Sequence, residues 1–203
     1  MVTKSDQRAK LTLKGLRGGY TLPLQGPGAA LKRTNGILFP FTPNISVAHA
    51  VEYSAYELVH TNYQQNSYGK TRNPQIQITG QFISQTPEEA LYTIGVMHFL
   101  RVVTKMNFGN SDEDAGTPPP VLNFSAYGAY NFKEVPVLVG SFNFFYEDGV
   151  DYVEAVAAGN QKVQIPTLMT MAIDLLPQYS PAKQNEFNLT NFANGGGYTG
   201  GFI

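Results

Sequence analysis

The stretch Gln75-Ile-Gln-Ile-Thr-Gly-Gln-Phe-Ile83 alternates between polar and apolar residues and begins the part of the chain that decides the fold. Ile76, Ile78 and Phe82 fall on one side at the period of two that is typical of a half-buried strand. Gly80 interrupts this apolar side, and we interpret it as a β-bulge. The stretch therefore predicts a strand with one face in a core.

A helix is predicted directly after this strand, because Thr86 is a good N-cap, Pro87 suits the first helical position and Glu89 completes a capping box. From here the chain is apolar on two helical faces as far as Met106, and Asn107 then ends the pattern. One apolar face can cover a sheet. The second face needs another element or another subunit.

Working outward, the remaining segments favour strands over helices. The chain has 203 residues with 20 Gly, 13 Pro, 12 Tyr and 13 Phe, a composition that suits turns and strands. Strand patterns recur on both sides of the predicted helix, in residues 37–41, 45–53, 121–127, 135–146, 152–158 and 161–176. Residues 60–74 are polar and rich in tyrosine, which indicates a long loop or hairpin. We expect seven to nine strands and one long helix.

Charge and composition exclude several classes of protein. The formal net charge is -1 and only 14% of residues are charged, so the chain lacks the basic excess of a dedicated nucleic-acid binder. Cysteine is absent, which excludes disulfides and thiolate chemistry. Neither a signal peptide nor a membrane-spanning stretch is evident, so we expect synthesis in the cytosol and no membrane partner. A sparse charge layer is typical of a surface that faces other protein.

The candidate chemical motifs are weak. Gly69-Lys-Thr71 lacks the earlier glycine of a phosphate-binding loop, because Gln64 stands there. The three histidines, His49, His60 and His98, have no metal-site spacing. Residues 112–114 are acidic but lack the spacing of a calcium-binding loop. We therefore expect no enzyme activity, no cofactor and no metal.

The order of segments resembles a known family. Asn73-Pro-Gln-Ile-Gln-Ile-Thr-Gly80 is followed by Gln81-Phe-Ile-Ser-Gln-Thr-Pro-Glu-Glu-Ala90, the helix, an aromatic strand and a strand rich in Thr and Met. This order, over residues 36 to 180, resembles the tail-tube-like proteins of contractile phage baseplates, which include tube initiators and hub proteins.

The resemblance implies a mainly β (α+β) fold, an antiparallel β-sandwich or barrel of tail-tube type with one long helix packed on the sheet and extended loops and termini. Residues 1–203 would form a single domain, with an N-terminal extended arm over about 1–36 and a flexible, glycine-rich C-terminal tail over about 181–203. Six copies would close a ring by pairing their sheets edge to edge around a lumen.

The first functional hypothesis is therefore a structural virion protein that initiates or continues the tail tube. Its partners would be further copies of itself and other tail or baseplate proteins (tail tube, hub and wedge), with no sequence-specific nucleic acid. The predicted interface residues are aromatic: Phe39, Phe41, Tyr53, Tyr56, Tyr63, Tyr68, Tyr198 and Phe202, together with the terminal Ile203.

Two alternatives come from other classes of protein. A β-sandwich module that binds carbohydrate or another small ligand would be a stable monomer with exposed aromatic rings. A hydrolase would build its site from scattered carboxylates. Binding of a sugar would identify the first, and loss of turnover on single Asp or Glu substitutions would identify the second.

Overall fold

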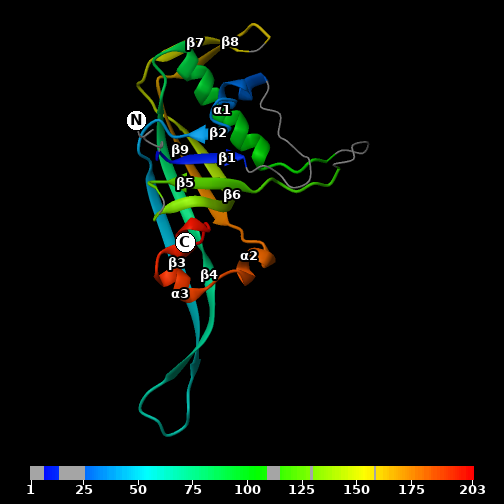
Figure 1. The fold of residues 1–203 in the computed structure, drawn as a ribbon. Coiled ribbons are helices and arrows are strands. Elements are labelled where there is room, and N and C mark those ends of the chain that lie inside the picture. Colours follow the sequence, from blue (N-terminus) through cyan, green and yellow to red (C-terminus); the bar gives the residue numbers. More distant parts are fainter. Residues whose placement is uncertain (1–6, 14–25, 109–114, 129, 158) are drawn as a thin grey trace.

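A computed structural model of the chain describes residues 7–13, 26–108, 115–128, 130–157 and 159–203. It has a seven-stranded antiparallel sheet with strand order β2-β1-β5-β6-β9-β4-β3 and a separate two-stranded β7–β8 hairpin (Figure 1). The strands are β1 (Lys10–Leu13), β2 (Gly36–Leu38), β3 (Asn44–Tyr56), β4 (Gln65–Ile83), β5 (Leu122–Ala126), β6 (Phe132–Tyr146), β7 (Tyr152–Ala157), β8 (Gln161–Pro166) and β9 (Leu168–Pro177). The predicted mainly β, antiparallel architecture is confirmed.

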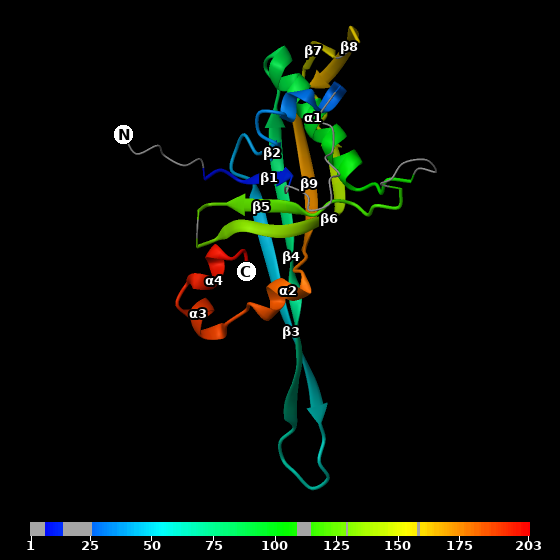
Figure 2. The ribbon, with the colours of Figure 1, turned by 45° about the vertical axis from the view of Figure 1, so that its right-hand side comes forward.

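Strand β6 divides the sheet into two layers. It pairs with β5 only as far as Val137, and it pairs with β9 from Val137 to Tyr146. The register shifts by one residue at Gly140, which is a bulge where the strand turns from one layer into the other. In Figures 1 and 2, β1, β5 and the first half of β6 cross β9, β4 and β3 steeply, as in an orthogonal sandwich.

The core lies between these two layers. One layer contributes Leu11, Ile37, Phe39, Leu122, Phe124, Val135 and Val137, and the other contributes Ile76, Ile78, Phe82, Met169, Met171, Ile173 and Leu175. The alternation predicted for residues 75–83 is confirmed, because Ile76, Ile78 and Phe82 are buried.

The interpretation of Gly80 as a bulge is wrong. Gly80 pairs in regular register with Met171 of β9. Its missing side chain makes room for Phe39, because a Cβ added to Gly80 would lie 2.6 Å from Cδ1 of the Phe39 ring. A glycine within an apolar strand face can thus mark a close neighbour on that face.

The predicted helix is α1 (Pro87–Val103), and its capping box is present. The Glu89 backbone N–H donates to Thr86 Oγ1 at 3.3 Å, and the Glu89 carboxylate accepts from the Thr86 backbone N–H at 3.1 Å. The helix ends earlier than predicted, with Thr104 as its C-cap, and the Thr104 hydroxyl donates to the Leu100 carbonyl at 3.1 Å. In the part of the chain that the structure describes, no helix has the length and apolar character needed to cross a membrane.

The second apolar face of α1 is covered within the same chain. A short 3-10 helix, η1 (Gly26–Leu31), packs on α1, and the β7–β8 hairpin lies over its other side. Gly95 permits the approach of η1, because a Cβ there would be 3.1 Å from the Pro27 carbonyl oxygen. Part of the predicted N-terminal arm therefore belongs to the body, since Leu11 of β1 and Leu31 of η1 are fully buried.

The C-terminal segment is folded rather than extended. It contains the short helices α2 (Pro181–Asn185), α3 (Leu189–Ala193) and α4 (Gly196–Thr199), and its end packs back on the body. The Phe202 ring stacks on Tyr179 with ring centroids 5.1 Å apart. In Figure 2 this segment lies beside β3 at the lower end of the body.

Candidate functional site

A long hairpin formed by β3 and β4 projects from the lower end of the body in Figures 1 and 2. The inner halves of both strands belong to the core sheet, where Ile45 pairs with Ile78 and Val47 with Ile76. Beyond Ala48 the two strands pair only with each other, and their side chains are exposed apart from the buried Pro74 and the half-buried Glu52. Residues 60–74, predicted as a long loop or hairpin, form part of the hairpin tip and the outer part of β4.

One face of the projecting hairpin is aromatic. Tyr53 and Tyr68 lie directly opposite each other, with their rings edge to face and their centroids 6.1 Å apart. Val51 lies on the same side by the alternation of β3, and the Tyr68 hydroxyl is 2.9 Å from Thr71 Oγ1. Cross-strand aromatic pairs stabilise such ribbons. About 60% of each of these two tyrosines remains exposed to solvent.

The other face of the hairpin is ionic. Glu52 forms an ion pair with Lys70 at 3.3 Å and a second with Arg72. The hydrogen bond from Arg72 is the main reason that the pKa of Glu52 lies below its ordinary value, and Lys70 acts in the same direction. Because these groups are in solvent, they contribute little stability. They do make the two hairpin faces chemically distinct.

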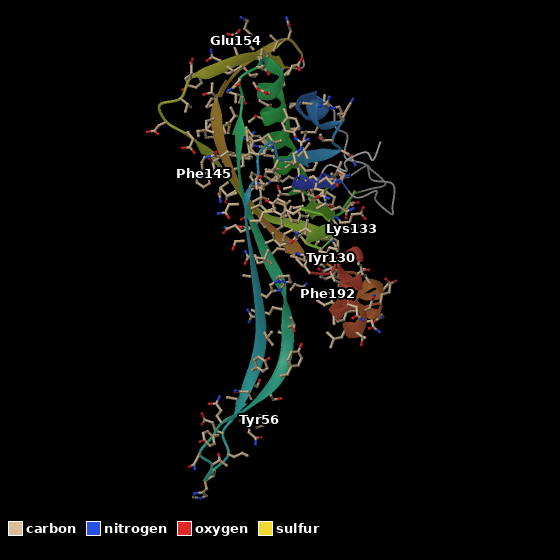
Figure 3. The ribbon with its side chains drawn as sticks, turned by 60° about the vertical axis from the view of Figure 1, so that its left-hand side comes forward. Tyr56, Tyr130, Lys133, Phe145, Glu154 and Phe192 are labelled. Carbon is tan, nitrogen blue, oxygen red and sulfur yellow. The ribbon has the colours of Figure 1, made fainter. Side chains whose placement is uncertain are left out.

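The tip of the hairpin gathers large apolar side chains far from the core. Tyr63 and Val59 are more than 80% exposed there. Tyr56 and Leu58 are also exposed, and Figure 3 shows Tyr56 well outside the body. Exposed apolar groups collected on one projection mark an interaction surface rather than a ligand pocket.

In the layer β6-β9-β4-β3 of the described sheet, the strands at both edges have open sides. β3 is the last strand and pairs with β4 alone. At the other end of the same layer, β6 has no partner on its outer side from Leu138 to Tyr146, because β5 pairs only as far as Val137. Open edges present unpaired N–H and C=O groups and are templates for pairing with another chain.

The outward face of the layer between these edges is almost uncharged. It carries two carboxylates: the Ser141 hydroxyl donates to Asp174, and the Thr170 hydroxyl donates to Glu147 at 2.8 Å. The other outward residues, assigned by alternation with the buried ones, include Asn44, Ser46, Ala48, Gln75, Gln77, Thr79, Gln81, Asn143, Phe145 and Ala172. A surface that faces bulk water normally carries a larger share of charge.

A shallow cleft of about 500 Å³ lies at the base of the hairpin. Val47 and His49 of β3 form one wall, and Phe192 and the C-terminal Ile203 belong to the opposite wall. Tyr130 completes the lining, and Figure 3 shows Tyr130 and Phe192 close to each other.

The structure places the predicted interface residues in three groups. Tyr53, Tyr56, Tyr63 and Tyr68 come together on the hairpin, and Phe41 is exposed beside the inner end of β3. Phe202 packs inside the C-terminal segment, and the Tyr198 side chain lies outside the described part of the chain.

Phe39 is misplaced in the predicted interface set. It is a core residue, because its ring fills the space above Gly80 and packs on Phe82 with ring centroids 5.7 Å apart. Sequence reasoning also missed the open edge of β6, although the uncharged run Ser141-Phe-Asn-Phe-Phe-Tyr146 is a signal for it.

Groups that could perform chemistry are dispersed. Among the described residues no three His, Asp or Glu side chains come together as a metal site would require. His49 lies at the cleft, His60 in the hairpin tip and His98 on α1. The acidic residues 112–114 lie outside the described residues.

Comparisons with known proteins identify no relative. No protein-family model matches the chain, and no curated protein sequence matches it. The assignment of function therefore depends on the geometry of the hairpin, the open edges and the sheet face with few charges.

Proposed function

We propose that this protein is a structural virion protein that forms a homo-oligomeric ring in a phage tail or baseplate and initiates or continues the tail tube. The single observation that carries the proposal is the open edge of β3, which runs on into an exposed aromatic hairpin. Assembly would cover both features. The neighbours of the ring would be other tail and baseplate proteins.

The two open edges support closure into a ring. The layer β6-β9-β4-β3 has four strands that alternate in direction, so β3 runs opposite to β6. Head-to-tail contact between copies would then bring β3 against β6 of the next copy in antiparallel pairing, and the alternation continues around the ring. A contact between different surfaces that closes on itself is the geometry of a cyclic oligomer.

The sheet face with few charges supports a particular orientation of each copy. The other face of this layer is covered by β1, β5 and β6 and by the core. In a closed ring the face with few charges would therefore point to the central channel. The hairpin, with its aromatic face and tip, would extend beyond the body and contact a neighbouring copy or an adjacent ring.

Native mass spectrometry and negative-stain imaging over a range of protein concentrations test the ring. We expect closed rings, and we expect the Tyr63→Ala/Tyr68→Ala variant to assemble poorly. Tyr152→Ala, which removes an exposed tyrosine of β7, is the matched control and should assemble normally. Monomers at every concentration, with no recruitment by co-expressed tail proteins, would refute the proposal.

Disulfide cross-linking tests the pairing of edges, because the natural chain has no cysteine. Ser46→Cys on β3 and Asn143→Cys on β6 place thiols on the same sheet face at opposite edges. The double variant should give a ladder of covalent oligomers that ends at the number of copies in the ring. Ser46→Cys combined with Glu154→Cys, on the distant β7–β8 hairpin, should give no ladder.

A ligand-binding module is the second candidate, and the cleft beside β3 favours it. Tyr130 is about three quarters exposed at this cleft, and aromatic rings at an open cleft suit stacking on a sugar. Titration with oligosaccharides, followed by tyrosine fluorescence, tests this function. A stable monomer whose emission changes on binding, and whose response is lost in Tyr130→Ala, would favour it over the ring.

A further inference from the structure

A small notch lies at the end of the layer β6-β9-β4-β3 that points away from the hairpin (Figure 1). It is lined by Phe41 from the connection before β3, by Phe82 and Ile83 from the end of β4, and by Glu89 and Tyr92 from α1. The volume of this Phe41 notch is about 200 Å³. A cavity of about 150 Å³ can hold a benzene molecule, so the notch has room for one aromatic ring.

The Phe41 notch lies where the end of β4 has no strand on the side of β3. The pairing of β3 with β4 begins at Asn44 and Thr79, whereas β4 continues to Ile83. Phe41 lines the notch beside this last part of β4, and more than half of Phe41 is exposed. Among the described residues, the notch therefore continues the open edge of β3.

Tyr146 stands at the same level on the opposite edge of the layer. Met169 of β9 pairs with Phe82 of β4 on one side and with Tyr146 of β6 on the other. By alternation, Tyr146 shares the core side of the layer with Phe142 and Phe144, which pack against the core. Tyr146 itself is more than half exposed, at the end of the open half of β6.

Tyr146 cannot fill the notch of its own copy. Strand β9 lies between β6 and β4, and adjacent strands are about 4.8 Å apart, so the two sites are on the order of 10 Å apart. The buried Met169 stands between them on the same side of the layer. In the proposed ring, however, β6 of the next copy lies beside β3, and its end passes the start of β3 and reaches the notch.

The chemistry of the Phe41 notch suits a tyrosine. The Glu89 carboxylate accepts from the backbone N–H groups of Gln85 and Thr86, and both of these hydrogen bonds use Oε2. A carboxylate has a second acceptor oxygen, so Oε1 can accept from a phenol hydroxyl. A tyrosine ring between Phe41 and Tyr92 would then have apolar neighbours and a partner for its hydroxyl.

We propose that in the ring Tyr146 of each copy occupies the Phe41 notch of the neighbouring copy, with its hydroxyl directed to Glu89. The proposal rests on the ring proposed above, because it needs β6 of one copy beside β3 of the next. The partner is therefore a second copy of this chain, and the contact removes exposed apolar surface of both copies from water.

This contact also sets the register of the junction. Ile45 of β3 and Phe142 of β6 lie at one level of the layer, because Ile78 and Ile173 connect them through β4 and β9. Seating Tyr146 in the notch would therefore bring Phe142 of one copy beside Ile45 of the next. Both side chains are half-buried in the single copy, and the junction would extend the core across the two copies.

Single substitutions followed by native mass spectrometry test the contact. Tyr146→Ala removes the ring, Phe41→Asp places a charge in the notch, and either should raise the concentration needed for assembly about tenfold. Tyr146→Phe keeps the ring and loses only the hydroxyl, so it should raise that concentration roughly threefold. Tyr152→Ala, at an exposed tyrosine of β7, is the control and should leave the concentration unchanged.

A mixing experiment separates loss of the contact from damage to the fold. The Tyr146→Ala copy keeps its notch, and the Phe41→Asp copy keeps its Tyr146 ring, so a mixture can form one intact junction. At a concentration where each variant alone is monomeric, we expect the mixture to give heterodimers of the two variants and no closed rings. Two variants with damaged folds would not combine in this way.

The outcomes distinguish this proposal from the ring itself. If the natural chain forms rings and both variants assemble as readily as Tyr152→Ala, the contact is overturned and the ring proposal stands. If both variants assemble poorly but their mixture gives no heterodimers, the contact is also overturned. If the natural chain forms no rings, the ring proposal fails, and the contact fails with it.

Discussion

Replacing Gly80 by alanine should destabilise the protein measurably, although the change adds a single methyl group. The added Cβ would lie 2.6 Å from Cδ1 and 2.8 Å from Cε1 of Phe39. Favourable contacts between carbon atoms lie at about 3.5–4.0 Å, so ring or backbone must move by about 1 Å. Phe39 is 1% exposed and its ring packs on Phe82, so a shift of the ring must also move the neighbouring core side chains.

The expected magnitude follows from this crowding. Overpacking of a well-packed core costs about 1–3 kcal/mol. For a domain of this size, each kcal/mol lowers the midpoint of thermal unfolding by about 2–4 °C. Urea unfolding and thermal unfolding of Gly80→Ala and the natural chain give the two quantities. Thr79→Ala, on the outward face of the same strand, is the control and should stay within about 0.5 kcal/mol.

A double-mutant cycle identifies the cause. Phe39→Leu replaces the ring by a smaller side chain, so the alanine at position 80 should cost much less in that background. The reasoning is refuted if Gly80→Ala alone is as stable as the natural chain. It is also refuted if its cost is the same with Phe39→Leu as with the natural residue.

Three further predictions concern single contacts. Thr86→Ala removes the N-cap of α1 and should lower the free energy of unfolding by about 1 kcal/mol in urea titrations; no change would mean that the cap is dispensable. Tyr92→Phe should cost about 1–3 kcal/mol in the same assay, because the Tyr92 hydroxyl accepts from the Leu38 N–H at 2.7 Å and donates to the Leu38 carbonyl at 3.0 Å. The pKa of Glu52 should lie below its unfolded value of about 4.3, so its contribution to stability is present above that pH and is lost as the pH falls through the lower folded pKa. Carbon-13 NMR titration of the carboxyl group measures this pKa, and the depression should become smaller in Arg72→Ala, where Lys70 alone remains.

Local patterns predicted the elements on which the fold depends. The helix after Thr86 was predictable because its N-cap, proline and capping glutamate are local signals that need no tertiary partner. The strand over residues 75–83 was predictable because one of its faces is buried, so its polarity alternates. The aromatic residues of the hairpin, which are exposed, were predicted to form an interface because they stand among polar residues.

Long-range features were not predictable from local patterns. Gly80 was interpreted as a bulge because its partner, Phe39, comes from a strand-flanking segment far earlier in the chain. The burial of Phe39 was not predictable for the same reason, because its partner Gly80 lies far along the chain. The local sequence does not distinguish Phe39 from Phe41, which stands two residues later and is exposed. The packing of Phe202 on Tyr179 was missed because a glycine-rich sequence predicts a flexible backbone and does not show where the chain end packs.

The length of β4 has a mechanical consequence. Its 19 residues form one strand from the hairpin tip to the core sheet, with two register shifts against β3 in the projecting part. In the core sheet β3 and β9 flank it in regular register, and the strand then leads to α1. A pull on the tip along this strand would load the hydrogen bonds of its inner half together, in shear, rather than break them one at a time. The projection can therefore act as a stiff tension element, which transmits force between an adjoining molecule and the centre of the body without unfolding the rest of the chain.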